Sequence, residues 1–188
     1  PKRISSTGGI YGSNPGKSNI ADTQTAVFEY EQLNCVWQHR TWGTPQDPEY
    51  PWGFKIYGEK GTLMGSPMKY DFIPVNGEAK IHRDLTYERE QYPEDLKERD
   101  IELFAAPATR RHMLNFLSAI DLGTRPVADI EEGHISTASC ILANLSMKLG
   151  RPLVYDQLLH IVKNDPEATL LLQREYRSPW IHPVPGTF

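Results

Sequence analysis

The chain has 188 residues, a formal net charge of −4 and a hydrophobic content of 39%. A chain of this length and composition can bury a substantial core, and we expect a single domain over residues 1–188. No apolar run approaches the roughly 20 residues of a membrane-spanning helix. The mild acidity gives no electrostatic reason to expect nucleic acid or an anionic membrane as a partner.

The first part of the chain, to about residue 82, has the pattern of strands separated by turns. Residues 23–30 and 33–42 are rich in β-branched and aromatic side chains and are joined by a very short connection, which predicts a hairpin. In the second strand Trp37 and His39 share one face and Arg40 lies on the other, because side chains alternate along a strand. Further strands are predicted at residues 3–10, at 54–64 as a pair around a tight turn, and at 68–75.

Residues 83–177 are mainly helical by their periodicity. Charge dominates residues 83–100, which predicts a solvated loop or a short irregular helix. From Thr109 onward, apolar residues recur with the period of an amphipathic helix that Gly123 ends. Its apolar stripe consists of Met113, Phe116, Leu117 and Ile120.

A second, longer helix is predicted over residues 129–149. Gly150 and Pro152 end this helix, because glycine accepts the left-handed conformation and proline cannot continue a helix. After a short strand at residues 153–155, Asp165 followed by proline predicts another helix start. Residues 178–188 are expected to form an extended tail.

Strands first and helices after predict an α+β fold: an open antiparallel or mixed β-sheet with helices packed on one face. We expect aromatic residues on the other face of this sheet. An exposed face of that kind is normally covered by a partner, so we expect a homo-oligomer that forms through the open sheet face.

Two cysteines, Cys35 and Cys140, lie in apolar sequence contexts. We expect both to be buried free thiols, since cysteine is among the residues most often buried. Neither has a cysteine or histidine neighbour at the spacing of a zinc site, and no metal centre is predicted.

Several short segments occur in an order and spacing that resemble a known family. They are Asp22-Thr23, Trp37-Gln38-His39-Arg40, Tyr57-Gly58-Glu59-Lys60-Gly61, His112-Met113-Leu114-Asn115, Gly133-His134, Asn164-Asp165-Pro166 and Tyr176-Arg177-Ser178-Pro179-Trp180. Together they resemble the C-terminal domain of the Gfo/Idh/MocA family of nicotinamide-dependent sugar and polyol dehydrogenases. The similarity is to a branch common in bacteria that degrade complex carbohydrates.

The resemblance implies a role and also a missing part. A complete member of that family has an N-terminal dinucleotide-binding domain, which holds NAD or NADP, and a catalytic lysine in a Glu-Lys-Pro motif. The chain contains neither a Gly-x-Gly-x-x-Gly sequence nor Glu-Lys-Pro, so it is expected to contain no catalytic and no cofactor-binding residue. The resemblance therefore implies the substrate-binding and oligomerisation domain of an NAD(P)-dependent sugar or polyol oxidoreductase, inactive by itself.

A non-catalytic dimerisation or scaffold module with the same fold is the alternative interpretation. The chain begins at Pro1 without an initiator methionine or a signal core, and we expect it to be part of a longer protein. The intact protein is expected in the cytoplasm, with the periplasm left open.

Four residues are candidates for binding the substrate. His39 and Arg40 end a predicted strand, where an imidazole and a guanidinium can meet a sugar hydroxyl or a carboxylate. Trp37 can stack on a sugar ring, and His134 lies near the start of the helix over residues 129–149. The structural alternatives stay open: a strand-end surface role for His39 and Arg40, a core or interface role for Trp37, and a backbone hydrogen bond for His134.

Overall fold

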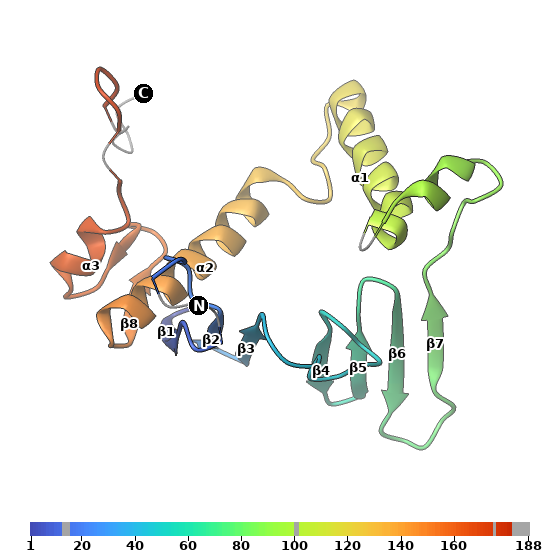
Figure 1. Ribbon diagram of the computed structural model, residues 1–188, viewed down its shortest axis with the longest axis horizontal. Helices are drawn as coiled ribbons and strands as arrows, with labels where there is room; N and C mark the ends of the chain where they lie inside the picture. Colours follow the sequence, from blue (N-terminus) through green and yellow to red (C-terminus); the bar gives the residue numbers. More distant parts are fainter. Residues whose placement is uncertain (13–15, 100–101, 175, 182–188) are drawn as a thin grey trace. The chain divides into compact units, whose positions relative to one another are not determined.

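The computed structural model describes residues 1–12, 16–99, 102–174 and 176–181 (Figure 1). The fold is α+β with open antiparallel sheets, as the sequence predicts. The strands belong to two hydrogen-bonded sheets rather than to a single one. By their internal contacts the residues form two compact units, Pro1–Gly43 with Ile130–Phe188, and Thr44–Asp129.

The first unit contains a five-stranded sheet with the order β3-β2-β1-β8-β9, in which all pairs are antiparallel. Its strands are β1 (Arg3–Gly9), β2 (Thr23–Glu29), β3 (Asn34–Arg40), β8 (Leu153–Asp156) and β9 (Ile161–Val162). Two helices complete the unit, α2 (Ile130–Leu149) and α3 (Pro166–Leu170). The predicted hairpin is β2–β3, with Phe28 opposite Cys35 and Gln24 opposite His39.

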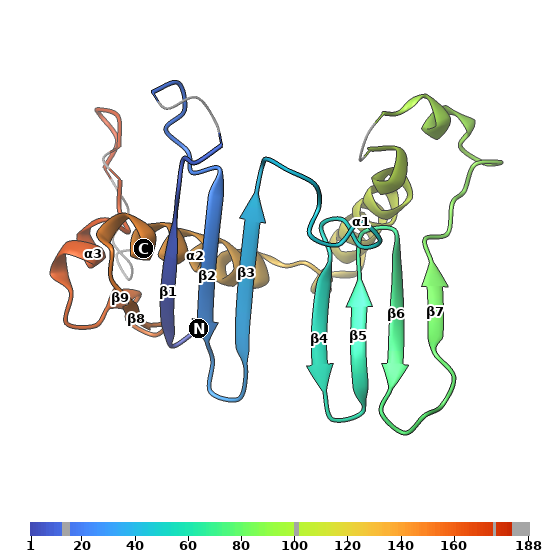
Figure 2. The same cartoon turned by 60° about the horizontal axis from the view of Figure 1, so that its bottom comes forward.

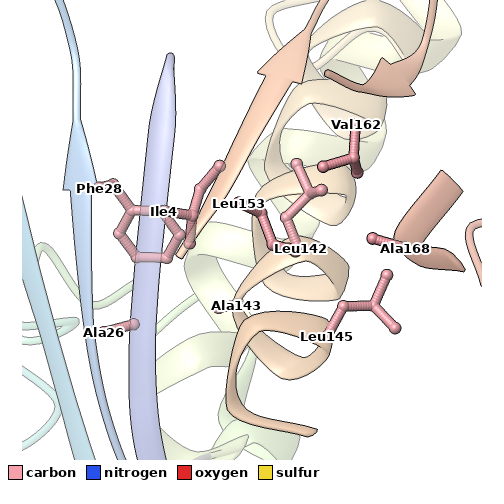
Figure 3. Packing of buried hydrophobic residues seen from close by; sticks show 9 residues of the cluster. All are labelled: Ile4, Ala26, Phe28, Leu142, Ala143, Leu145, Leu153, Val162 and Ala168. Atoms are coloured by element: carbon pink, nitrogen blue, oxygen red, sulfur yellow. The ribbon is translucent and has the colours of Figure 1, made fainter. Parts of the chain in front are cut away.

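The core of this unit lies between one face of the sheet and α2. Every second residue of β2 is buried, and Ala26 and Phe28 point toward the helix, as the period of a strand requires. Figure 3 shows the nine side chains of the core gathered around α2. They are Ile4, Ala26, Phe28, Leu142, Ala143, Leu145, Leu153, Val162 and Ala168.

The ends of the helices confirm the predictions made from glycine, proline and aspartate. After α2, Gly150 has φ of +66°, a left-handed conformation that glycine adopts without strain. The Arg151 amide returns to the Ser146 carbonyl at 3.3 Å and so satisfies an end-of-helix acceptor. The Asp165 side chain caps α3 by accepting the Ala168 amide at 3.0 Å.

The face of the first sheet that points away from α2 differs from the sequence-based expectation. It carries Thr23, Thr25, Val27 and Glu29 of β2, which are half-buried, and Asn34, Val36, Gln38 and Arg40 of β3. The aromatic side chains of the two strands, Phe28 and Trp37, lie on the α2 side, since Trp37 is opposite Ala26. Aromatic residues are thus absent from the described part of the open face of β2 and β3.

The second unit contains a four-stranded antiparallel sheet with the order β4-β5-β6-β7 (Figure 2). Its strands are β4 (Phe54–Gly58), β5 (Gly61–Gly65), β6 (Lys69–Pro74) and β7 (Ile81–Asp84). A 3-10 helix, η1 (Pro93–Lys97), and a long helix, α1 (Glu102–Leu122), follow. Arg110 on α1 joins the two helices, because its guanidinium donates to Asp95 at 2.7 Å and to Glu88 at 3.0 Å.

Three expectations about the second unit and the cysteines were incomplete or wrong. Strand β7 has a single apolar residue and no visible alternation, so it was not predicted. Helix α1 begins before Pro107, whereas a proline normally indicates a helix boundary. Both cysteines are exposed, because Cys35 lies on the edge strand β3 and Cys140 on a part of α2 that the sheet does not cover.

The apolar stripe predicted for α1 is present but not buried. Met113, Phe116, Leu117 and Ile120 remain 48–61% exposed. Of the tail predicted over residues 178–188, residues 182–188 lie outside the described part of the chain. Residues 178–181 form neither helix nor strand.

Candidate functional site

The outer edge of the first sheet brings two of the predicted residues together. Trp37 and His39 lie on the α2 side of β3, and the Trp37 indole Nε1 donates a hydrogen bond to His39 Nδ1 at 3.2 Å. The two rings meet edge to face with their centroids 6.3 Å apart. Trp37 is 54% exposed and His39 is half-buried, so both are accessible at this edge.

A row of polar side chains continues from this edge toward α2. Gln24 is directly opposite His39 and only 7% exposed. Its amide Nε2 donates to Ser6 Oγ at 3.0 Å and to Asn144 Oδ1 on α2 at 3.2 Å. Ser146, two residues further toward the end of the helix, accepts the Ser6 backbone amide at 3.0 Å. Trp37, His39, Gln24 and Asn144 form what we call the β3-edge cluster.

Sequence reasoning identified Trp37 and His39 but missed Gln24 and Asn144. A signal was present for Gln24, because it occupies the buried face of β2 together with Ala26 and Phe28. A polar residue in an apolar register is normally retained only with hydrogen-bond partners. Asn144 gives no such signal, since it is an exposed helix residue 120 positions away in the sequence.

Arg40 lies on the opposite face of β3 from this cluster. It is the cross-strand partner of Thr23, and its guanidinium lies 5.9 Å from the centroid of the Trp42 ring. The Trp42 indole donates to Thr23 Oγ1 at 2.9 Å. A cation over an aromatic face is a stabilising arrangement in itself, so this geometry fits a structural role as well as a binding role.

His134 is placed with residues of the β8–β9 connection. Its ring packs edge to face on His160 with the centroids 5.3 Å apart. His160 Nδ1 is 3.1 Å from the Tyr155 hydroxyl, and burial raises the pKa of Tyr155 above its ordinary value. The predicted residues therefore separate into the pair Trp37 and His39, Arg40 on the other face, and His134 beside His160.

The second unit contains a buried acidic network that the sequence did not indicate. Asp71 of β6 is 1% exposed, accepts the Tyr50 hydroxyl, and lies 2.8 Å from His82 Nδ1 and 3.1 Å from Lys80 Nζ. Hydrogen bonds from Tyr50 and His82 hold the pKa of Asp71 well below its usual range. The hydrogen bond between Tyr50 and Asp71 also raises the pKa of Tyr50 to about 12. This network attaches the segment before β4 to one face of the second sheet.

The opposite face of the second sheet carries large apolar side chains, with Arg83 at its β7 edge. Paired residues place Phe54 and Tyr70 in one row, and Ile56, Leu63, Phe72 and Ile81 in the next row of the same face. A shallow hollow on this face is bordered by Ile56, Leu63, Phe72 and the β4–β5 turn. Phe54, Ile56, Tyr70 and Ile81 are 41–57% exposed, which is unusual for four large apolar side chains in adjacent rows.

The described residues contain no group of three or more histidine, cysteine, aspartate or glutamate side chains that could hold a metal ion. None of the described helices is both long enough and apolar enough to cross a membrane. Gly58 and Gly61 close the β4–β5 hairpin, and the turn between them is too short for a phosphate-binding loop.

The fold of this chain is similar to that of part of two solved structures. An oxidoreductase from Agrobacterium radiobacter, crystallised with NAD+, L-tartaric acid and magnesium, matches 81% of the chain with a TM-score of 0.63 and 13% identity. The protein yvaA from Bacillus subtilis, assigned as an oxidoreductase, matches 83% with a TM-score of 0.50 and 11% identity. The match covers 43% and 46% of these two proteins, so the chain spans less than half of either.

At these identities the likeness concerns the fold alone. No protein-family model matches the sequence, and no curated protein matches it either.

Proposed function

We propose that this chain is the substrate-binding and oligomerisation part of an NAD(P)-dependent sugar or polyol oxidoreductase of the Gfo/Idh/MocA family. The observation that carries the proposal is the partial match: four-fifths of the chain corresponds to less than half of an oxidoreductase crystallised with NAD+. The family resemblance in the sequence supports the same assignment. The chain lacks a Gly-x-Gly-x-x-Gly sequence, so the cofactor and the catalytic lysine belong to another part of the enzyme.

In this proposal the chain holds the substrate while a hydride passes between the nicotinamide and a carbinol carbon. Its contribution is to orient the carbon that reacts, which lowers the entropic part of the barrier. Trp37 and His39 are the best supported binding residues, because they lie together at an accessible edge. Arg40 and His134 stay candidates for a second contact with the substrate or with the cofactor domain.

We further propose that the protein is a homo-oligomer that associates through the apolar face of the second sheet. The other face carries the buried Asp71 and its bond to Tyr50, whereas this face has no charged residue at its centre. Its large side chains are about half exposed, and burying them against a second copy removes apolar area from water. Light scattering is expected to detect a dimer or a larger oligomer at tens of micromolar protein, because an interface of standard size forms at such concentrations. A monomer under these conditions contradicts this part of the proposal.

A non-catalytic dimerisation module is the second candidate. The observation that favours it is the same open apolar face in a chain without a phosphate-binding loop. Such a module binds a partner but neither a nicotinamide cofactor nor a polyol, and this difference separates the two candidates experimentally.

The test uses the protein encoded by the complete reading frame that contains residues 1–188. The expected result is a dinucleotide-binding segment in that frame and a change of absorbance of the nicotinamide when sugars and polyols are supplied with NAD or NADP. Calorimetry on the 188-residue chain alone is expected to give no saturable binding of either cofactor. A frame without a dinucleotide-binding segment, or a complete protein without turnover, contradicts the enzyme and favours the dimerisation module. We expect a cytoplasmic location for the enzyme.

A further inference from the structure

The hydrogen bonds of the β3-edge cluster determine which atoms are left to bind a ligand. Ser6 has a single hydroxyl proton, which it donates to the Thr25 carbonyl at 3.3 Å. In its contact with Gln24, Ser6 Oγ must therefore be the acceptor. The donor is the side-chain NH2 group of Gln24. This assignment fixes the orientation of the Gln24 amide.

The orientation of Gln24 then fixes that of Asn144. The Gln24 NH2 also faces Asn144, so Asn144 must present its carbonyl oxygen to Gln24. Both protons of the Gln24 amide are used, and its Oε1 has no hydrogen bond from the described residues. In the described part of the chain, every buried side-chain N or O atom has a hydrogen-bond partner. Gln24 Oε1 has none, and it must therefore be in contact with solvent. The pair thus offers one acceptor, Gln24 Oε1, and one donor, Asn144 Nδ2.

The contact between Trp37 and His39 fixes the remaining donor. The Trp37 indole can only donate, so His39 Nδ1 must be the unprotonated nitrogen that accepts. With Nδ1 occupied by this contact, Nε2 is the ring nitrogen that can donate to a ligand oxygen. Trp37 has no further polar group, and its half-exposed ring offers an apolar face only.

We propose that the β3-edge cluster binds a pair of neighbouring hydroxyl groups of an uncharged sugar or polyol. A hydroxyl group both donates and accepts, and so it matches the mixed set of Gln24 Oε1, Asn144 Nδ2 and His39 Nε2–H. Gln24 and His39 are directly opposite, where Cβ atoms are about 4.5–5.5 Å apart, so adjacent hydroxyls can reach both. The Trp37 ring then packs on the C–H face of the sugar.

The same arrangement disfavours a carboxylate. A carboxylate only accepts hydrogen bonds and repels Gln24 Oε1, whereas strong carboxylate binding in proteins uses a charged donor such as arginine. The cluster contains no guanidinium, since Arg40 lies on the opposite face of the strand. The inference depends on the proposed function for the biological role of the site, but the binding itself is measurable without the cofactor domain.

The experiment is a titration of the 188-residue chain with D-glucose and with L-tartrate, followed by two-dimensional NMR of the tryptophan indole protons. The Trp37 signal, assigned with Trp37→Phe, is expected to shift saturably with D-glucose and not with L-tartrate. Long-range ¹H–¹⁵N spectra are expected to show His39 protonated on Nε2 only. Preference for tartrate, no saturable shift with D-glucose, or a proton on His39 Nδ1 overturns the proposal.

Two variants test the donors and one controls for charge. Asn144→Asp keeps the acceptor for Gln24 but loses the outward donor, and His39→Phe removes the Nε2 donor. Each is expected to weaken D-glucose binding by about three- to tenfold, the size of one lost hydrogen bond. Gln38→Glu makes the same amide-to-carboxylate change on the exposed opposite face of β3 and is expected to leave binding unchanged. Parent-like binding by both test variants overturns the proposal.

The outcomes separate this inference from the proposed function. Turnover by the complete enzyme, together with unaltered sugar binding in these variants, refutes the β3-edge cluster and leaves the oxidoreductase intact. Sugar binding that depends on Asn144 and His39, in a protein without any NAD(P)-dependent turnover, supports the cluster and refutes the oxidoreductase.

Discussion

At the scale of single residues, Asp71 shows how a buried charge is retained. A carboxylate that is 1% exposed is costly unless hydrogen bonds compensate for the lost water. Tyr50, His82 and Lys80 each supply a bond to it, and Lys80 adds a positive charge. The segment before β4 is therefore attached to the second sheet by polar contacts with a buried acid.

Replacement of Tyr50 by phenylalanine is expected to lower the melting temperature of the chain. The substitution keeps the ring but removes the hydroxyl that donates to Asp71, which leaves a buried acceptor with fewer partners. Tyr57→Phe is the matched control, because Tyr57 is 78% exposed and its change should leave the melting temperature unaltered. Equal melting temperatures for the two variants contradict the account.

His82 makes this contribution dependent on pH. Its ring contacts Asp71 and Asp84, and these carboxylates raise the pKa of His82 above the ordinary value of 6.5. Lys80 and Tyr50 also contact Asp71, and Tyr50 keeps its proton over this range because its pKa is raised to about 12. Because the pKa of His82 is higher in the folded state, its protonation stabilises the fold fully at pH values below 6.5. This contribution is lost as the pH rises through the raised pKa.

The stability difference between the parent and His82→Gln is therefore expected to shrink as pH increases above 6.5. Thermal unfolding of both proteins across that range measures the difference. A difference that grows with pH, or that does not depend on pH, refutes the assigned role of His82.

At the scale of elements, α2 is held to the first sheet by a small number of buried aliphatic side chains. Leu142 is 1% exposed and belongs to the core cluster between α2 and the first sheet (Figure 3). Leu142→Ala is expected to lower the free energy of unfolding by about 2–5 kcal/mol, through lost burial and the cavity that remains. Urea unfolding measures this value, and Leu122→Ala at a 71% exposed position should cost far less.

Close packing of β1 against β2 and α2 requires glycine at position 8. A Cβ atom on Gly8 would lie 2.1 Å from the Thr23 carbonyl oxygen and 3.0 Å from Met147 Sδ, so the backbone would have to move. Gly8→Ala is expected to destabilise the chain in urea unfolding. Gly133→Ala is the opposite control: its Cβ meets nothing within 4 Å, and alanine in a helix is favoured by about 0.5–1 kcal/mol. A stabilising Gly8→Ala contradicts the described packing.

The elements also show what the sequence can predict. The strands β1 to β3 and the helix α2 follow from alternation, helix periodicity and the end signals at Gly150 and Asp165, because these features are local. Strand β7 does not, because its place depends on neighbours in β6: Ile81 extends an apolar row from Phe72, and His82 bonds Asp71.

The candidate site also contains residues that could be predicted from the sequence and residues that could not. Trp37 and His39 could be predicted as neighbours, because residues two apart share a strand face. Gln24 and Asn144 could not be joined to them from sequence, because a helix and a strand 120 residues apart meet only in the folded chain. The burial of Cys35 was predicted wrongly for a related reason, since strand order, and hence the edge position of β3, is not written in local sequence.

At the scale of the whole molecule, our proposals rest on two exposed features of the chain. The apolar face of the second sheet is available for a second copy, and the β3-edge cluster is available for a ligand. In the proposed enzyme the cofactor approaches from a separate domain, so substrate handling and hydride transfer are divided between parts of one protein. Substitutions in the β3-edge cluster should then alter kinetics more than stability.

The central claim is that this chain binds the substrate of a nicotinamide-dependent oxidoreductase through the edge of its first sheet. The most direct measurement is the steady-state kinetics of the complete protein carrying His39→Phe, compared with Gln38→Glu. We predict that His39→Phe lowers kcat/KM by roughly tenfold, equivalent to about 1.4 kcal/mol, while its melting temperature stays close to that of the parent. Parent-like kinetics combined with a large loss of melting temperature would contradict the claim and assign His39 a structural role.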